Sequence, residues 1–335
     1  MSAGRPKRKV WFMRQMCAET KMSPATLILL TLFSFFSAAA AEKQTYVYKT
    51  VGDLKIEADV YRPAGKGPFP AILMLHGGAL IMGNRNVNPR QIDRYLGAGY
   101  AVVSIDYRLA PETKASGIFE DLRDAWRWMR TEKSLRIDPN RMAVTGGSAG
   151  GYLTLVSGYL LRPRPKAIVS FFGYGDPTGD WESKPWPPYM RGTLVSEAEA
   201  RKGVGPRETT NGGGKGRGAF YMYCRQTGRW PQEVIGLDPR REPRALDRYC
   251  PVRNVTRRYP PTLLWHGDKD TDVPYQQSVD MAAELQRKHV EHELVIVLGA
   301  GHGFGMTEEQ WVKLLGFLNK HVAGHASVST ASAIR

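Results

Sequence analysis

A serine set between glycines is the first feature of this chain whose residue types could do chemistry. Residues 146–151 read Gly-Gly-Ser-Ala-Gly-Gly, between the apolar run 141–145 and a helix-like stretch at 152–161. A strand, a sharp turn and a helix in that order would present the hydroxyl of Ser148 above the edge of a sheet. The flanking glycines have no Cβ atom to clash with the turn or with a substrate. The pattern is weak alone, but this context makes Ser148 a candidate nucleophile.

A serine hydroxyl is a poor nucleophile near neutral pH and needs a base to accept its proton. Among seven histidines, His302 is the best candidate because its loop follows a predicted strand at 294–298. The acid that orients the base is expected between the serine and the histidine in the chain. His266 precedes the acidic loop and would reverse that order. The loop 266–274 offers three carboxylates, among which the residues alone do not choose: Asp268, Asp270 and Asp272.

Backbone amides are the expected partners for the negative charge that develops on a substrate oxygen. The amide of Ala149 directly follows the candidate nucleophile, and Gly77 and Gly78 follow a predicted strand at 71–75. Glycines at that point let the backbone approach a carbonyl group closely. A plain turn would also explain two glycines, but their coincidence with the serine, the acidic loop and His302 favours an oxyanion hole.

Short apolar runs alternate with amphipathic stretches and would position these groups. We expect strands at 45–50, 54–61, 71–75, 101–105, 141–145, 167–172, 261–265 and 294–298. We expect helices at 88–96, 118–131, 152–161, 276–288 and 308–321. Fully apolar strands between helices are typical of a mostly parallel sheet covered on both faces, whose carboxyl ends meet at one edge. The candidate serine, acid and histidine all follow such strands.

The segment 174–259 breaks this rhythm because it is rich in Pro, Gly, Trp and Arg. We interpret it as a cap-like insert that overhangs the active edge. Trp181, Trp186 and Tyr189 are candidates for substrate binding, although the simpler interpretation is that such aromatic residues form the insert's own small core.

Residues 1–41 have the features of a secretory signal peptide, with a basic start, an apolar stretch at 27–36 and small residues before Glu42. A start at Met13 or Met16 would give a leader of more usual length. Cleavage before Glu42 would make the protein secreted or periplasmic. A retained anchor in a membrane is the alternative, although the apolar stretch is short for a hydrocarbon core of about 30 Å.

Composition narrows the function classes further. The chain has 335 residues, 42% of them hydrophobic, and a net charge of +15, of which +5 falls in 1–41 and +6 in 174–259. This charge comes without a recognition motif, so no specific nucleic-acid partner is predicted. No Cys/His spacing is typical of a zinc site, and neither a metal nor a cofactor is expected. Cys224 and Cys250 could form a disulfide or remain separate thiols, and residues 323–335 are expected to form a flexible tail.

Taken together, these segments resemble the α/β-hydrolase superfamily, in particular its hormone-sensitive-lipase-like and feruloyl/acetyl-xylan-esterase-like carboxylesterases. The resemblance covers about residues 45–320 outside the insert and rests on 76–79, 106–112, 146–150, 266–270 with 273–274, and 301–302. It implies an α/β-hydrolase fold with a catalytic domain at 42–173 and 260–322. It also implies that Asp270 is the catalytic acid and that His76 shapes the oxyanion loop. Ala79 replaces a third glycine of many relatives, which argues against bulky tertiary-alcohol esters.

The resemblance implies a cofactor-free serine hydrolase that cleaves small carboxylic esters through an acyl-enzyme, with Ser148, Asp270 and His302 as a catalytic triad. The aspartate loop also resembles that of prolyl-oligopeptidase-like peptidases, so a serine peptidase is an alternative. A catalytically silent binding protein on the same scaffold is another. The stretch 106–112 has no mechanistic role that we can derive, and an ion pair between Arg108 and Glu112 is expected to lock it. The sequence does not predict the oligomeric state.

Overall fold

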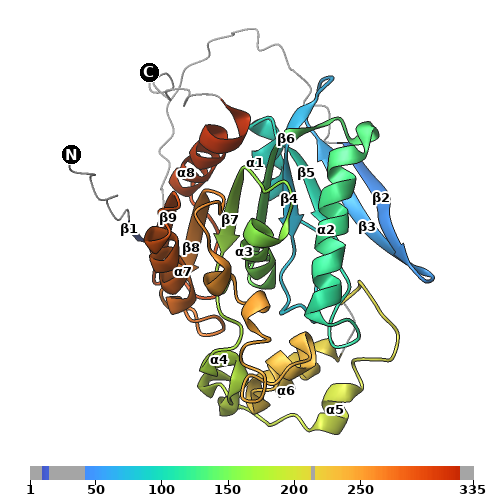
Figure 1. Ribbon diagram of the computed structural model, residues 1–335, viewed down its shortest axis with the longest axis vertical. Coiled ribbons are helices and arrows are strands. Elements are labelled where there is room, and N and C mark those ends of the chain that lie inside the picture. Colours follow the sequence, from blue (N-terminus) through green and yellow to red (C-terminus); the bar gives the residue numbers. More distant parts are fainter. Residues whose placement is uncertain (1–9, 15–41, 213–215, 325–335) are drawn as a thin grey trace, which may run out of the picture.

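The computed structural model describes residues 10–14, 42–212 and 216–324. Within these residues, nine strands form one sheet in the order β1-β9-β8-β7-β6-β4-β5-β3-β2 (Figure 1). In this spatial order, neighbouring strands are parallel from β1 through β9, β8, β7, β6 and β4 to β5. The last two pairs, β5 with β3 and β3 with β2, are antiparallel. The strands are β1 Val10–Arg14, β2 Glu42–Val51, β3 Leu54–Arg62, β4 Phe69–Leu75, β5 Ala101–Ile105, β6 Ile137–Gly147, β7 Ala167–Phe171, β8 Thr262–Gly267 and β9 His292–Leu298. The predicted mostly parallel sheet is confirmed.

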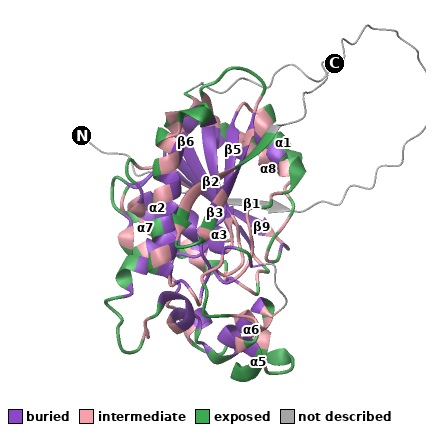
Figure 2. Cartoon of the chain, turned by 90° about the vertical axis from the view of Figure 1, so that its right-hand side faces the viewer, coloured by how far each residue is buried: buried purple, intermediate pink, exposed green. Residues whose placement is uncertain are grey.

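Helices cover both faces of this sheet. Figure 2 shows α1 and α8 on one side of the buried strands and α2, α3 and α7 on the other. These helices are α1 Pro89–Gly97, α2 Ala115–Thr131, α3 Ala149–Leu160, α7 Gln276–Arg287 and α8 Glu308–Leu318. Every residue of β5, β7 and β8 is buried. Double coverage therefore explains why these strands are continuous apolar runs rather than alternating patterns.

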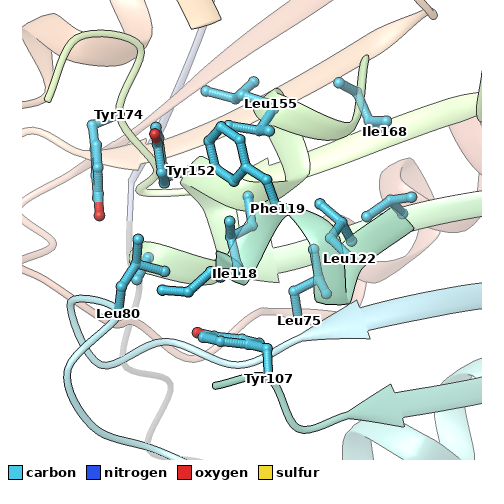
Figure 3. Close-up of a cluster of buried hydrophobic side chains, with 14 of the residues drawn as sticks. Leu75, Leu80, Tyr107, Ile118, Phe119, Leu122, Tyr152, Leu155, Ile168 and Tyr174 are labelled. Atoms are coloured by element: carbon cyan, nitrogen blue, oxygen red, sulfur yellow. The ribbon is translucent and has the colours of Figure 1, made fainter. Parts of the chain in front are cut away.

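The larger hydrophobic core lies between the sheet and α2 and α3 and continues toward the insert (Figure 3). Leu75 from β4 and Phe119 from α2 belong to it, and so does Tyr174, the first residue of the insert. The Tyr152 ring of α3 stacks on Tyr174 at 4.7 Å, and its hydroxyl donates to the carbonyl oxygen of Tyr249. The insert therefore shares a core with the sheet domain.

The insert contains helices that the sequence did not predict. They are α4 Asp180–Ser183, α5 Glu197–Arg201 and α6 Arg217–Thr227, with short helical turns η2 Pro187–Arg191, η3 Pro231–Ile235, η4 Asp247–Tyr249 and η5 Pro251–Asn254. In Figure 1 they lie together at one end of the molecule, beyond the sheet. Cys224 and Cys250, both buried here, are free thiols, so the disulfide alternative is wrong.

The predicted ion pair between Arg108 and Glu112 is wrong as well. Arg108 instead binds the buried carboxylate of Asp121 through Nε and Nη2, and its Nη1 lies 2.9 Å from Glu208. Glu112 binds Arg217 of the insert. Both arginines therefore connect the loop after β5 to other elements instead of closing that loop on itself.

Only five residues of the predicted leader are described, and they form β1, which pairs with β9. The other residues of 1–41 and the tail from residue 325 onward lie outside the described residues, so signal peptide, secretion and flexible tail stay predictions. Among the described helices, none combines the length and apolar character needed to cross a bilayer.

Candidate active site

The turn between β6 and α3 holds Ser148 in a conformation that non-glycine residues rarely adopt, with φ 56° and ψ −122°. Its amide donates to the carbonyl oxygen of Phe171 at 2.9 Å. A Cβ at Gly150 would lie 2.7 Å from the carbonyl oxygen of His76 and would overlap that of Leu75. The glycines predicted to permit a sharp turn therefore also permit α3 to pack directly against the end of β4.

The structure brings Ser148, His302 and Asp270 into one hydrogen-bonded chain. His302 Nε2 lies 3.0 Å from Ser148 Oγ, and Nδ1 lies 2.7 Å from Asp270 Oδ2. Phe172 contacts the imidazole edge-on, with ring centroids 4.9 Å apart. Of the other two carboxylates in the loop, Asp268 turns away and accepts a hydrogen bond from the amide of Gly299. Serine, imidazole and carboxylate are thus placed as nucleophile, base and orienting acid require.

A second histidine, which the sequence analysis set aside, supports Asp270. His266 Nε2 faces Asp270 Oδ2 at 3.1 Å and the carbonyl oxygen of Val273 at 3.0 Å. Both partners are acceptors, so Nε2 carries the proton, and Nδ1 accepts from the hydroxyl of Ser278. Burial alone would raise the pKa of Asp270, but hydrogen bonds from both imidazoles and from the Val273 amide outweigh burial and hold that pKa well below its usual range. The carboxylate is therefore ionised.

Opposing effects act on His302. Burial lowers the pKa of its imidazole, but the hydrogen bond to Asp270 and the negative charges of Asp272 and Asp270 outweigh burial, so the pKa is raised. Asp272 Oδ2 lies 3.3 Å from His302 Nε2, the nitrogen that also faces Ser148. The site therefore stabilises the imidazolium form that a general base passes through.

The loop after β4 has a fixed shape around His76. The His76 ring stacks on Tyr107 at 4.1 Å, and its Nδ1–H donates to the carbonyl oxygen of Gly77. Burial lowers the pKa of His76 to about 4, so its imidazole is neutral near pH 7. Gly78 has φ 109°, and a Cβ there would overlap the carbonyl oxygen of Met82. His76 is thus a structural part of this loop.

The amides of Gly77 and Gly78 donate to no acceptor within the described part of the chain, and neither does the amide of Ala149 at the first turn of α3. Gly77 lies beside the candidate nucleophile, since a Cβ on it would be 3.3 Å from the Cβ of Ser148. The free amides of Gly77 and Ala149 thus flank the serine, and that of Gly78 follows in the same loop.

A cavity of about 700 Å³ reaches Ser148 from the side of α1 and α8. This volume lies within the usual range of small-molecule sites, about 300–1,000 Å³. Its apolar wall consists mainly of Met74, Phe171, Phe172, Phe304, Met306 and Trp311. Asn88, Arg90, Arg94 and Glu308 contribute polar groups.

None of the three insert aromatics that were candidates for substrate binding lines this cavity. Trp181 is buried and packs against Arg225, with the guanidinium 5.0 Å from its ring. The indole of Trp186 donates to the carbonyl oxygen of Thr271, and the hydroxyl of Tyr189 donates to Asp272. The insert aromatics thus pack on one another and on the acidic loop.

No group of three or more His, Cys, Asp or Glu side chains in the described ranges is arranged to hold a metal ion. Sequence reasoning set His266 aside as the base, named Asp272 only as a candidate for the acid, and missed Arg225. The spacing of His266 and Asp270, four residues apart across one turn, was the available signal for His266. No local pattern pointed to Arg225 or to the contact of Asp272 with the imidazole.

Comparisons with known proteins agree with this architecture. A family described as alpha/beta hydrolase fold matches residues 72–306. Among solved structures, a Staphylococcus aureus protein of unknown function has a TM-score of 0.67 at 21% identity, covering 84% of this chain and 99% of that one. The butyrate-bound thermophilic esterase Est2 of Thermogutta terrifontis has a TM-score of 0.58 at 22% identity, covering 86% of this chain and 95% of that one. At these identities the likeness shows a common fold.

Curated relatives come from much longer proteins. The non-reducing polyketide synthase Preu6 of Preussia isomera is 30% identical over 302 residues, which cover 79% of this chain and 14% of the synthase. The non-reducing polyketide synthase pkbA of Emericella nidulans is 28% identical over 330 residues, which cover 79% of this chain and 13% of the synthase. This chain thus spans about a seventh of the length of these relatives. With most of its sheet domain inside the matched range, the chain belongs to the α/β-hydrolase family.

Proposed function

We propose that this protein is a serine esterase that cleaves carboxylic esters through an acyl-enzyme. The hydrogen-bonded chain from Ser148 through His302 to Asp270 is the observation that carries this proposal. Four other features support it: the ionised Asp270, the raised pKa of His302, the free amides beside the serine and the cavity that ends at it.

Acylation follows from this geometry. Ser148 Oγ attacks the ester carbonyl carbon while its proton passes to His302 Nε2. The resulting imidazolium keeps its Nδ1–H bond to the Asp270 carboxylate, which stabilises the positive charge. As the tetrahedral intermediate collapses, Nε2 gives the proton to the leaving alkoxide oxygen, and the alcohol departs. Water then attacks the acyl-enzyme with the same imidazole as base, which releases the acid and restores the serine.

The amides of Gly77, Gly78 and Ala149 would bind the oxyanion of each tetrahedral intermediate. Loss of one such donor typically costs about 3–4 kcal/mol of transition-state stabilisation. His76 and Tyr107 hold the first two of these amides. The Tyr107 hydroxyl donates to the His76 carbonyl, whose peptide carries the Gly77 N–H, and His76 Nδ1–H donates to the Gly77 carbonyl, whose peptide carries the Gly78 N–H. Preorganised donors need no reorientation as the charge develops.

The acyl group and the alcohol are assigned to different sides of the serine. His302 Nε2 faces Ser148 and Asp272, so the departing oxygen must receive its proton on the side of the acidic loop. The cavity walls include Gly77 and Ser148 but neither Asp272 nor any insert residue. We therefore place the acyl group in the cavity and the alcohol beneath the insert (174–259), which would act as the cap.

Replacement of Ser148 by alanine tests the proposal. We expect wild-type protein to hydrolyse p-nitrophenyl butyrate and to react with a fluorophosphonate probe, and S148A to lose both while its circular dichroism spectrum is unchanged. S134A, at an exposed serine remote from the site, is the matched control. Hydrolysis of an aminoacyl p-nitroanilide by the wild type tests the alternative of a serine peptidase. Probe labelling of S148A, or a wild type inert toward esters, would contradict the assignment.

Cleavage of acyl thioesters is a second candidate, favoured by the similarity to a segment of non-reducing polyketide synthases. The same serine and imidazole can attack a thioester, whose thiolate leaves more readily than an alkoxide. Comparing butyryl-N-acetylcysteamine with ethyl butyrate separates the two candidates, since a synthase-like activity predicts strong preference for the thioester.

We also propose that residues 1–41 direct secretion. Expression of the full chain in a secreting host, followed by N-terminal sequencing of the exported product, tests this. A mature end near Glu42 is expected, and export without processing would indicate a retained anchor instead.

A further inference from the structure

A second carboxylate stands on the nucleophile side of the imidazole. Asp272 Oδ2 lies 3.3 Å from His302 Nε2, the same nitrogen that lies 3.0 Å from Ser148 Oγ. Asp270, in contrast, binds the opposite nitrogen, Nδ1. The imidazole is therefore set between two carboxylates, of which the mechanism above uses only one.

The insert holds Asp272 in this place. Its Oδ1 accepts hydrogen bonds from the hydroxyls of Tyr189 and Tyr221, and Arg225 Nη2 donates to its backbone carbonyl oxygen at 2.9 Å. Arg225 is fully buried, and Glu182 lies 2.9 Å from its Nη1. Oδ1 is thus occupied by the two tyrosine hydroxyls and also lies 3.4 Å from Arg225 Nη1, which leaves Oδ2 directed at the imidazole.

We propose that Asp272 is a positioning residue, held by the insert, that stabilises the protonated imidazole of His302 from the Nε2 side. The inference rests on the proposed ester hydrolysis. A neutral imidazole turns the Nε2 lone pair toward this anion, which is repulsive, whereas an imidazolium turns an N–H toward it, which is attractive. Asp272 therefore favours the charged ring both at rest and while it holds the proton taken from Ser148.

The other groups around the imidazole do not replace this effect. Asp270 acts on Nδ1 and is itself shared with His266. The positive charge of Arg225 opposes the effect, and the charge of Asp272 raises the pKa of His302 against it. The ring face toward Phe172 is apolar. Ser148 and the two tyrosines, all neutral near pH 7, complete the surroundings.

The pH profile of wild-type enzyme and D272N measures the effect on turnover. An opposite charge this close typically shifts a pKa by 1–3 units, so we expect the acid limb of kcat/KM to move to lower pH by about one unit in D272N. The value on the plateau should fall about tenfold, because the transition-state imidazolium loses the same stabilisation. D268N removes a charge from the same loop and should change neither quantity.

Direct titration of the imidazole separates this inference from the proposed function. The His302 resonance of ¹³C-histidine-labelled protein is followed by NMR in S148A, in S148A/D272N and in S148A/D268N, where no turnover is needed. We expect the midpoint to fall by about one pH unit only with D272N. Equal midpoints in D272N and D268N would overturn the role of Asp272. An absence of esterase activity would refute the proposed function and leave this titration readable.

The role of the insert is tested by removing the two hydroxyls. Y189F/Y221F should lower the midpoint in the S148A background and should have no further effect when D272N is present. An equal shift with and without D272N would show that the tyrosines act on the imidazole independently, contrary to the proposal. The tyrosine pair also carries the test if D272N fails to fold, because phenylalanine keeps the rings and their packing.

Discussion

Ser148 occupies a strained backbone conformation that persists only because its neighbours fix it. A non-glycine residue in such a region costs about 1–3 kcal/mol. The hydrogen bond from the Ser148 amide to the carbonyl oxygen of Phe171 holds one side of the turn, and close packing of Gly150 against the end of β4 holds the other. The glycine is therefore needed for space rather than for helix formation, since α3 would otherwise prefer alanine.

We predict that Gly150→Ala destabilises the folded state by about 3 kcal/mol and abolishes esterase activity, because the new Cβ overlaps the Leu75 carbonyl and must displace backbone. Urea denaturation and hydrolysis of p-nitrophenyl butyrate measure the two effects. Gly316→Ala is the matched control: this glycine also lies within a helix, α8, but has no atom within 4 Å of the added Cβ. It should gain about 0.5–1 kcal/mol. Equal stabilities for the two variants would contradict the packing argument.

At the scale of elements, the insert is joined to the sheet domain by buried charge as well as by shared core. Arg217 of α6 pairs with Glu112 in the loop after β5, with 6% and 1% of the two side chains exposed. The guanidinium also donates to the carbonyl oxygens of Ala110 and Ile81. Breaking a pair buried to this extent leaves an uncompensated charge, whereas breaking an exposed pair does not.

Glu112→Gln should therefore lower the free energy of unfolding by about 3 kcal/mol. The exposed pair of Asp180 and Lys184 in the same insert provides the comparison, with 74% and 56% of the side chains exposed. Asp180→Asn should cost less than about 0.5 kcal/mol. Chemical denaturation of both variants checks this, and similar losses would mean that the Arg217 contact contributes little to attachment of the insert.

Element boundaries could be predicted where a single local cause sets them. The strand Ala101–Ile105 was predicted at its observed limits, because a short run with four apolar residues among five is typical of a strand buried on both faces. The helix α2 begins at Ala115 rather than 118, and its N-cap residue Lys114 makes no capping bond that a sequence pattern could reveal. The helix α6 was missed because its sequence mixes glycine, arginine and aromatic residues without a clear apolar stripe.

For the whole molecule, the order of the candidate catalytic residues along the chain could be predicted, but the contacts between residues far apart in the chain could not. The order of serine, acid and histidine, each after a strand, suffices to place the candidate site at one edge, because carboxyl ends of parallel strands meet there. Arg108, however, binds residues 13 and 100 positions away. Asp272 is likewise set by tyrosines of the insert. Such contacts depend on how the loops fold over one another, which periodicity does not encode.

The free energy of unfolding should depend on pH in a way that reflects the buried imidazole of His76. His76 has a pKa near 6.5 when unfolded, and burial lowers it to about 4 in the folded protein. Between these values the unfolded chain binds a proton that the folded chain does not, so stability present above pH 6.5 is lost as the pH falls toward 4. The loss is about 1.4 kcal/mol per pH unit within that window.

His76→Phe keeps a ring stacked on Tyr107 and removes this titration. The difference in unfolding free energy between wild type and H76F should be constant from pH 7 to 8 and should then shift by about 3 kcal/mol in favour of the variant between pH 6.5 and 4. Urea unfolding across this range measures the difference, in which other titrating groups cancel. A difference that does not change with pH would mean that the ring takes up its proton while folded, and the loop that carries the Gly77 and Gly78 amides would then be open to water.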